Sequence, residues 1–345
     1  MSIRFSVIVP IGPERSAPVL TSLARLDFPT DAYEVVVERG PSPSRNRNRA
    51  IARASGSVMA FVDDDCVVDP EWLARAAQFL DAHPEYDVVG GPQLTPPSDG
   101  VLARAAGRVL ASRFGAWRMS RRFRKGRLDL QATETVLSSA NLFVRREVFA
   151  RCGPFDPRLW PNEETELLHR IAMTGSRIAY DPRLIVLHHR RTSLRALGRQ
   201  CFRYGAGRAR QTRLTGVRPG AGVVIPLLFL LYLGLLPALM TLQPIAAMPL
   251  AVYAGLVGTW SIATVFRARD PALLGALPPA VLTVHVAYPT GFLVESLRLW
   301  LGGELGEIGA RDQRPRRRSV RHSCVASKPA ASGAGRATRG FARIR

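Results

Sequence analysis

The chain contains 48 consecutive residues, 219–266, without one charged side chain, and no other feature restricts its fold as strongly. A single helix of this length would measure about 72 Å, whereas the hydrocarbon core of a bilayer is roughly 30 Å thick. The segment must therefore fold back on itself, and the break is best placed at residues 241–244. This predicts transmembrane spans near 222–241 and 245–266, with a buried hairpin of a soluble protein as the alternative.

A third apolar segment covers residues 271–300 and is interrupted by Pro278, Pro279 and Pro289. Such a segment can span the membrane, re-enter it or lie at its surface, so the sequence allows two spans or three. A simple third span would carry the basic C-terminal residues out of the cytosol, which the positive-inside rule disfavours. The predicted membrane region as a whole is 219–303.

Most of the net charge of +21 lies in two segments that flank these apolar residues. Residues 177–219 carry 11 basic and 1 acidic side chains and residues 311–345 carry the same numbers, whereas residues 1–176 carry 23 and 21. This distribution argues against a nucleic-acid-binding domain and is typical of segments that contact anionic lipids. We therefore predict a multi-pass protein of the cell inner (plasma) membrane, with a cytosolic N-terminal domain, membrane lipids as partners and a disordered basic tail at 311–345.

Residues 1–215 alternate between short apolar runs and helix-like segments. The runs that predict buried strands are 5–10, 33–38, 58–62, 88–91, 139–144, 177–180 and 184–187. The segments that predict helices are 19–26, 45–54 with Ser44 as its cap, 70–82, 146–152 and 164–174. This order is typical of βαβ units around a mostly parallel sheet, so the predicted fold class is α/β.

Residues 101–127 form a segment of a different kind. Apolar side chains recur at helical spacing in its first half, and basic side chains crowd its end. This pattern predicts an amphipathic helix at the membrane interface, and an ordinary solvated helix followed by a loop is the alternative.

Acidic residues gather at two places. Asp63-Asp64-Asp65 directly follows a predicted strand, at the sheet edge where α/β proteins bind their ligands. Two carboxylates that flank one residue can bind a divalent metal, and the metal can bridge a diphosphate, although acid clusters also cap helices. Glu163 and Glu164 begin a later helix, where a carboxylate can act as a general base or can simply be favoured by the helix dipole.

A further candidate site lies just before the first apolar span, at Gln200, Arg203 and Tyr204. An amide, a guanidinium and an aromatic ring at this spacing can hold a sugar or a phosphate. The alternative is a basic helix that contacts lipid head groups.

Several short motifs occur in a fixed order along residues 3–210. They are Phe5-Ser-Val-Ile-Val-Pro10, Arg45-Asn-Arg-Asn-Arg-Ala-Ile51, Ala60-Phe-Val-Asp-Asp-Asp65 with Pro70-Glu-Trp-Leu73, Ser139-Ala-Asn-Leu-Phe-Val-Arg-Arg146, Gly153-Pro-Phe-Asp156, Asn162-Glu-Glu-Thr-Glu-Leu167, and Tyr180-Asp-Pro182 followed by His188. In this order they resemble the family 2 glycosyltransferases, whose nucleotide-diphospho-sugar transferase fold is called GT-A. The C-terminal apolar segments resemble the subgroup that builds bacterial exopolysaccharide or glycolipid.

The resemblance implies roles for the matching residues. It implies Mg²⁺ or Mn²⁺ at Asp63, Asp65 and His188. It implies Glu164 as the general base, with Glu163 beside it. The residues implied for the nucleotide-sugar are Pro10, Glu38, Arg45, Arg47, Asn48, Asp63 and Asp64. Those implied for the acceptor or the diphosphate are Asn141, Trp160, Gln200, Arg203 and Tyr204.

Three positions depart from the family pattern. Residues 11–13 are Ile-Gly-Pro where the family has Thr-Tyr-Asn, Glu38 replaces the Asp that contacts the nucleobase, and Glu164 replaces the Asp base. We expect an inverting transferase that moves a sugar from a nucleotide-diphospho-sugar, with UDP-sugars favoured, to a lipid or lipid-linked glycan at the cytosolic membrane face. The alternative is a catalytically weakened subunit that binds nucleotide-sugar or glycan within a polysaccharide synthase complex.

Overall fold

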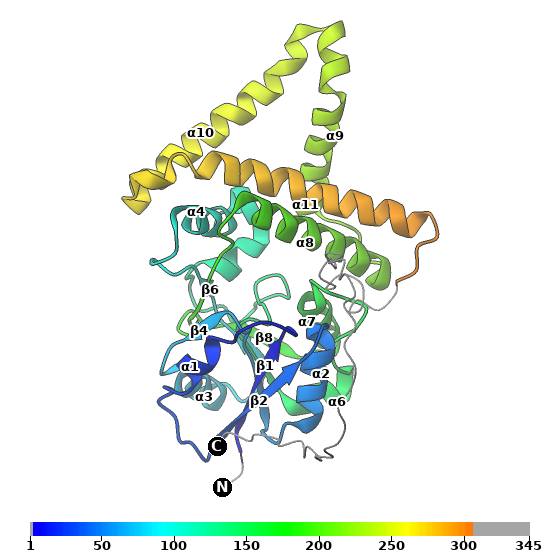
Figure 1. The fold of residues 1–345 in the computed structure, drawn as a ribbon. Helices are drawn as coiled ribbons and strands as arrows, with labels where there is room; N and C mark the ends of the chain where they lie inside the picture. The colour runs from blue at the N-terminus through cyan, green and yellow to red at the C-terminus, as the bar shows by residue number, and fades with distance from the viewer. Residues whose placement is uncertain (1–2, 306–345) are drawn as a thin grey trace, which may run out of the picture.

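The computed structural model describes residues 3–305 of the 345-residue chain. These residues form an α/β domain, a layer of helices on one side of it, and a helical hairpin that projects from this layer (Figure 1). The predicted basic tail, 311–345, lies outside the described residues.

The strands and helices of residues 1–215 include those predicted from the sequence. The strands are β1 Phe5–Ile11, β2 Tyr33–Arg39, β3 Val58–Phe61, β4 Cys66–Val68, β5 Tyr86–Gly90, β6 Gln93–Leu94, β7 Leu142–Arg145, β8 Arg177–Tyr180 and β9 Val186–His188. The helices of the domain are α1 Val19–Leu23, α2 Pro43–Arg53, α3 Trp72–Ala82, α4 Val101–Leu110, α5 Arg113–Ala116, the 3-10 helix η1 Trp117–Phe123, α6 Arg146–Cys152, α7 Glu163–Met173 and α8 Leu194–Thr215. The remaining helices are α9 Ala221–Leu242, η2 Pro244–Ala247, α10 Met248–Ala268, η3 Pro271–Leu273 and α11 Leu277–Trp300.

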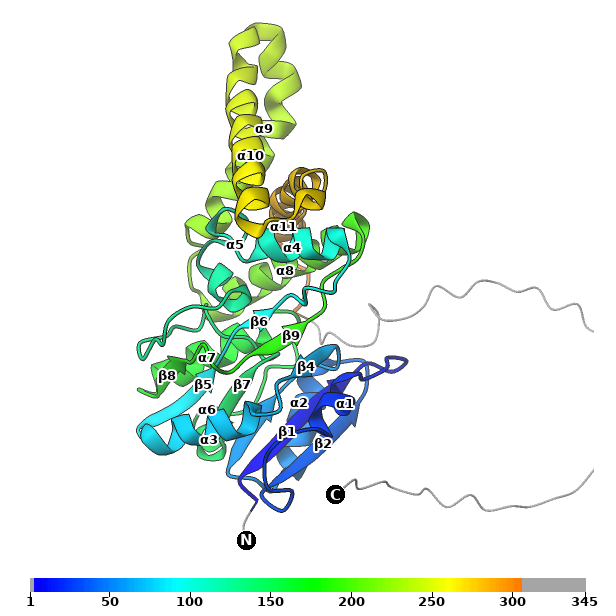
Figure 2. The same cartoon turned by 90° about the vertical axis from the view of Figure 1, so that its left-hand side faces the viewer.

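The main sheet has six strands in the order β2-β1-β3-β7-β5-β8 (Figure 2). Strand β1 pairs in parallel with β2 and β3, and β5 pairs in parallel with β8, whereas β7 runs antiparallel to both of its neighbours. The α/β prediction is therefore confirmed. A second sheet, in the order β4-β9-β6, sets His188 opposite Cys66, directly after the acidic triplet.

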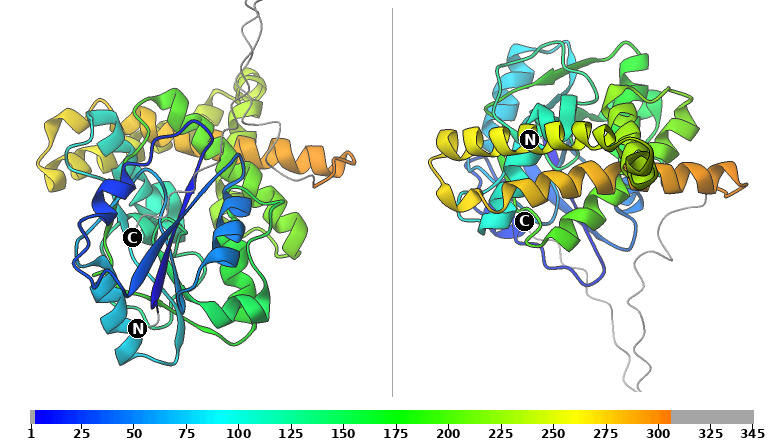
Figure 3. Two further views of the ribbon diagram at one scale, coloured as in Figure 1. Left: turned by 60° about the horizontal axis from the view of Figure 1, so that its bottom comes forward. Right: turned by 90° about the horizontal axis from the view of Figure 1, so that it is seen from above.

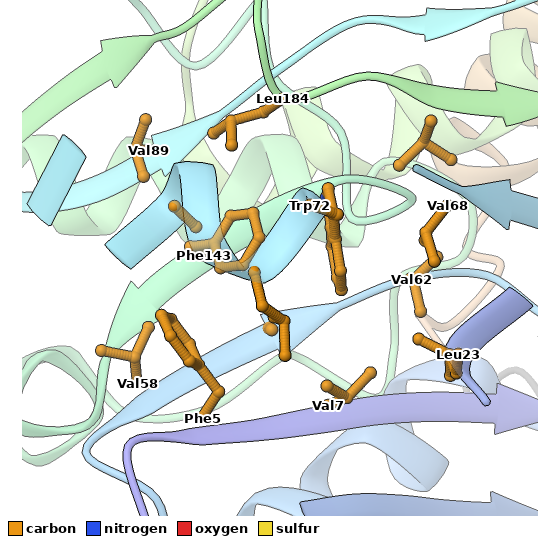
Figure 4. Close-up of a cluster of buried hydrophobic side chains, with 14 of the residues drawn as sticks. Phe5, Val7, Leu23, Val58, Val62, Val68, Trp72, Val89, Phe143 and Leu184 are labelled. Carbon is orange, nitrogen blue, oxygen red and sulfur yellow. The ribbon is translucent and has the colours of Figure 1, made fainter. Parts of the chain in front are cut away.

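The core explains why the first predicted strand is a continuous apolar run. Phe5 and Val7 of β1 face a cluster that includes Trp72 and Phe143, while Ile8 faces a second cluster on the other side of the sheet. Figure 4 shows the first cluster, in which the rings of Trp72 and Phe143 lie 4.7 Å apart. Because both faces of the sheet are covered, every position of β1 is buried, and its one polar side chain, Ser6, is hydrogen-bonded to Glu34 and to the Gly56 N–H.

Two local predictions were wrong. Helix α2 begins at Pro43, and its cap is Ser42, whose side chain accepts a hydrogen bond from the Arg45 backbone N–H, rather than Ser44. Residues 101–127 are not one amphipathic helix, because Ser112 ends α4 and caps the separate helix α5. The apolar side of α4 packs against α11, so that it contacts protein rather than solvent.

Three helical segments are long and apolar enough to cross a membrane: α9, residues 244–268 with α10, and α11. Of the 18-residue apolar stretch in each segment, only 11% is buried in α9 and in residues 244–268, against 39% in α11. Helices α9 and α10 project as a hairpin, whereas α11 lies along α8 and crosses the base of the hairpin (Figures 1 and 3). The composition of these helices is consistent with membrane association.

Glycines allow α8 and α11 to approach closely. A Cβ atom added to Gly205 would lie 1.9 Å from the carbonyl oxygen of Tyr288, and one added to Gly291 would lie 1.9 Å from that of Phe202. An ion pair of 2.6 Å between Arg210 and Glu295 joins the same two helices. Helix α11 is thus packed into the body of the protein by backbone contacts that only glycine permits.

Candidate active site

A cavity of about 1860 Å³ begins at the carboxyl edge of the main sheet and extends to the first turns of α9. Pockets for one small ligand are usually about 300–1000 Å³, so this cavity has room for two substrates. The predicted site residues that line it are Pro10, Arg47, Asp63, Asp64, Asp65, Trp160, Glu163, Glu164, His188, Gln200, Arg203 and Tyr204.

The acidic triplet contacts a histidine that is distant in sequence. The Nε2 atom of His188 lies 3.1 Å from Asp65 Oδ1, and its Nδ1 atom lies 2.5 Å from Gln93 Oε1. Because an amide oxygen only accepts hydrogen bonds, Nδ1 carries the proton and Nε2 faces Asp65. Ligand atoms of Asp65, Cys66 and His188 lie within 4.8 Å of one another, which makes this the candidate metal centre.

Charge and burial separate the roles of the residues in this centre. Burial alone would raise the pKa of Asp65, but His188 and Arg15 outweigh it and hold that pKa well below its usual range. Burial raises the pKa of Asp64 to about 6 against the opposing effect of Arg15, whose Nη2 lies 3.0 Å away. Burial also raises the pKa of the Cys66 thiol, so at neutral pH Asp65 is ionised and the Cys66 thiol is protonated.

Two buried arginines hold the acidic start of α7. Arg47 pairs with Glu163 at 2.6 Å and with Asp63 at 2.8 Å, so it links the two acidic clusters. Arg122 pairs with Glu164 at 2.7 Å, and its other N–H groups bind backbone carbonyls and a threonine hydroxyl. Burial raises the pKa of Glu163, with Arg47 opposing the effect. Both carboxylates are thereby fixed at the wall of the cavity.

Helix α8 brings the juxtamembrane residues to the same cavity. Gln200 donates a hydrogen bond of 3.0 Å to the Tyr204 hydroxyl, and the Arg203 guanidinium lies 5.5 Å from the ring centre of Trp160. Asn162, which adopts a left-handed backbone with φ of 83°, donates to the Tyr204 carbonyl oxygen at 3.3 Å. The start of α7 and the middle of α8 are therefore directly connected.

Four predicted site residues do not line the cavity. Glu38 pairs with Arg49 and Arg53, and Asn48 exchanges hydrogen bonds with the backbone of Phe155. Asn141 is fully buried, where it accepts a hydrogen bond from Trp72 and donates to backbone carbonyls. Arg45 is exposed on α2. The two asparagines therefore stabilise the fold around the site.

Sequence reasoning missed Arg15, Arg122 and Gln93. Arg15 follows the departure at residues 11–13, which was the only signal that this loop is unusual. Arg122 is one of six basic residues between 118 and 127, and its spacing does not distinguish it from the others. Gln93 lies 95 residues from His188, and no local pattern joins them.

Comparison with known proteins decides the family. The sequence profile described as "Glycosyltransferase like family 2" matches residues 20–207, which is more than half of the chain. The chain belongs to this family. It is 28% identical over 179 residues to glycosyltransferase AglE of Haloferax volcanii, covering 51% of this chain and 54% of that protein. It is 29% identical over 156 residues to the succinoglycan biosynthesis protein ExoA of Rhizobium meliloti, covering 45% and 46%.

The chain thus spans about half the length of these curated relatives. Among solved structures, the mannosyltransferase PcManGT from Pyrobaculum calidifontis, in complex with GDP-Man and Mn²⁺, aligns with a TM-score of 0.51 at 21% identity. The alignment covers 86% of this chain and 88% of that one. The sheet domain of this family 2 member therefore has the GT-A fold, and helices that are candidates for membrane spans follow it.

Proposed function

We propose that this chain transfers a sugar, with inversion, from a nucleotide-diphospho-sugar to a lipid or lipid-linked glycan. The observation that carries the proposal is one cavity lined by Asp63, by Asp65 and His188, by the Glu164 carboxylate and by the apolar start of α9. A donor diphosphate fits the end of the cavity at the acidic residues, and an amphipathic acceptor fits the end at α9. UDP-sugars are the favoured donors because of the resemblance to the family.

A divalent metal fits the first end of the cavity. Asp65 is ionised and His188 presents Nε2, and these hard or borderline ligands suit Mg²⁺ or Mn²⁺. The side chain of Asp63, which is 29% exposed, would be the third ligand of the metal. When bound, the metal would neutralise the charge that develops on the departing nucleotide diphosphate. PcManGT, which shares the fold, was solved with GDP-Man and Mn²⁺, and this supports both a nucleotide-sugar and a divalent ion here.

Glu164 is the proposed general base. The acceptor hydroxyl would give its proton to Glu164 while its oxygen forms the new bond to the anomeric carbon, on the face opposite the bond to the diphosphate, which breaks. Arg122 would hold the Glu164 carboxylate in place through the 2.7 Å ion pair. Arg47, fixed between Asp63 and Glu163, would orient the donor, with Pro10 and Asp64 lining the same end.

The proposed membrane topology has two spans. Helices α9 and α10 expose apolar side chains along their length, while α11 is held against α8 by its glycine contacts. Helix α9 ends at Leu242 and η2 begins at Pro244, and these residues would form the turn between the two spans. With the basic segment 177–219 in the cytosol, the cavity would open at the inner leaflet, where a lipid-linked acceptor is available. A larger polysaccharide-synthesis complex would be compatible with this arrangement.

Release of nucleotide by membranes that contain the full chain tests the proposal. UDP-, GDP- and dTDP-sugars are supplied with lipid extract, with Mn²⁺ or with EDTA. One donor should be cleaved only in the presence of metal, and Asp65→Asn should abolish the release, whereas Asp81→Asn, at an exposed position outside the cavity, should not. Absence of release from every donor would contradict the proposal and favour a binding subunit.

A further inference from the structure

The cavity is acidic at one end and basic at the other. At the catalytic end, the lining arginines Arg15, Arg47 and Arg122 are all paired with carboxylates. Toward α9, the lining arginines include Arg118, Arg191, Arg199, Arg203, Arg208 and Arg218. None of these six forms an ion pair with any other residue between 3 and 305. The wall between Glu164 and the hairpin therefore carries positive charge that no carboxylate of the described chain neutralises.

One face of α8 supplies much of this wall. Tyr204, Arg208 and Thr212 follow one another at intervals of four residues and line the cavity, so they lie on one side of the helix. Gly205, on another side, approaches the backbone of α11. In Figure 1 α8 lies between α11 and the sheet domain. The helix thus leads from Tyr204 beside the catalytic end to the beginning of the hairpin.

Arg208 is partly buried, as is Arg191 among the six arginines. Its Nη1 donates to Gln211 Oε1 at 2.8 Å, and its Nη2 lies 3.8 Å from the Met119 sulfur, which is a weak acceptor. Burial lowers the pKa of the neighbouring Arg122, and the positive charge of Arg208 adds to this effect. The guanidinium groups of Arg122 and Arg208 repel each other, and an anion bound between them would relieve the repulsion.

We propose that Arg208 binds the phosphate or diphosphate of an acceptor lipid whose hydrocarbon chain leaves the cavity along α9. The inference rests on the proposed function and identifies the chemical class of its acceptor. The hairpin adds apolar side chains to the cavity wall, with Val223, Ile225 and Phe229 of α9 and Tyr253 of α10. The order of metal centre, general base, cationic side chain and apolar wall matches a sugar donor followed by the head group and chain of a lipid phosphate.

The experiment uses the purified full chain in uncharged detergent micelles, with hexadecyl phosphate, hexadecanol and inorganic phosphate as probes for calorimetric titration. Hexadecyl phosphate should bind at least about tenfold more tightly than hexadecanol, because hydrogen bonds to an ionised group are worth that factor or more. Arg208→Gln should remove this difference. Arg213→Gln should preserve it, since Arg213 is an exposed arginine of the same helix outside the cavity.

Binding of UDP and of GDP with Mn²⁺ is measured on the same variants. An unchanged Kd in Arg208→Gln would show that the cavity is intact, and failure of all nucleotides to bind would count against the proposed function alone. Equal binding of hexadecyl phosphate and hexadecanol, or equal losses in the two arginine variants, would overturn the inference. Inorganic phosphate that binds as tightly as hexadecyl phosphate would indicate a site for a free anion and would also overturn it.

Discussion

Replacement of Glu164 by Gln is the change that tests the proposed chemistry most sharply. Glutamine keeps the size of the side chain and can accept a hydrogen bond from Arg122, but it cannot take a proton from the acceptor. General bases typically contribute 10²- to 10⁴-fold to a rate, so we expect kcat for sugar transfer to fall about 10²- to 10⁴-fold. The Kd of the donor should be unchanged, because Glu164 pairs with Arg122, whereas Arg47 is held by Asp63 and Glu163.

The same change has a calculable cost in stability. Removing one partner of a buried ion pair costs about 3–5 kcal/mol when the remaining charge is left without compensation. Arg122 keeps two backbone carbonyls and the Thr165 hydroxyl as acceptors, so we expect about 1–3 kcal/mol instead. For a domain of this size the melting temperature should fall by about 2–4 °C per kcal/mol. The protein should therefore remain folded although its kcat for sugar transfer is greatly reduced.

Nucleotide release and sugar transfer by the purified chain, at saturating donor, provide the assay. Glu164→Asp, which restores the residue usual in the family, should keep most of the rate. A Glu164→Gln enzyme that retains a third or more of the wild-type kcat would refute the reasoning and would shift attention to Glu163.

Three further predictions follow from the packing and the charges. Asp65→Asn should weaken Mn²⁺-dependent donor binding at least about tenfold in equilibrium titrations, since it removes the ionised ligand of the centre. Burial raises the pKa of Glu163 above the ordinary 4.5, so the folded state binds more protons than the unfolded state, and the free energy of unfolding should fall as pH rises from 4.5 toward neutral. Thermal melts should show a smaller slope for Glu163→Gln, with Asp64 contributing what remains. Gly205→Ala should destabilise the protein by about 1–3 kcal/mol, because the new Cβ meets a backbone oxygen of α11 at 1.9 Å, whereas Gly198→Ala, with 3.4 Å to the nearest atom, should be nearly neutral.

Much of the fold could be predicted because local patterns reflect burial. Strand β1 is buried at every position and is apolar except for Ser6, whose hydroxyl is hydrogen-bonded to Glu34 and to the Gly56 N–H. The antiparallel course of β7 between β3 and β5 was not predictable, since pairing between distant segments leaves no mark on either one alone. The sequence left the place of α11 open for a related reason. Hydropathy reports that a helix is apolar but not whether lipid or α8 covers it.

The candidate site likewise contains residues that the sequence could predict and residues that it could not. Asp63, Asp65 and Glu164 stand out because acidic side chains follow a strand or begin a helix, and the structure brings them to one cavity. Their cationic partners are distant in sequence, with Arg122 42 residues from Glu164 and Arg47 116 residues from Glu163. Such partners are chosen by the fold, so one sequence does not single them out among so many arginines.

The measurement that tests the central claim most directly is transfer of a radiolabelled sugar from a nucleotide-sugar into the organic phase of a lipid extract. Purified full chain, Mn²⁺ and each donor in turn are incubated with the extract, beside Glu164→Gln and a reaction with EDTA. The account predicts metal-dependent label in the organic phase from one donor, reduced about 10²-fold or more in the variant. Label that stays entirely in the aqueous phase, while the donor binds normally, would contradict transfer to a lipid acceptor.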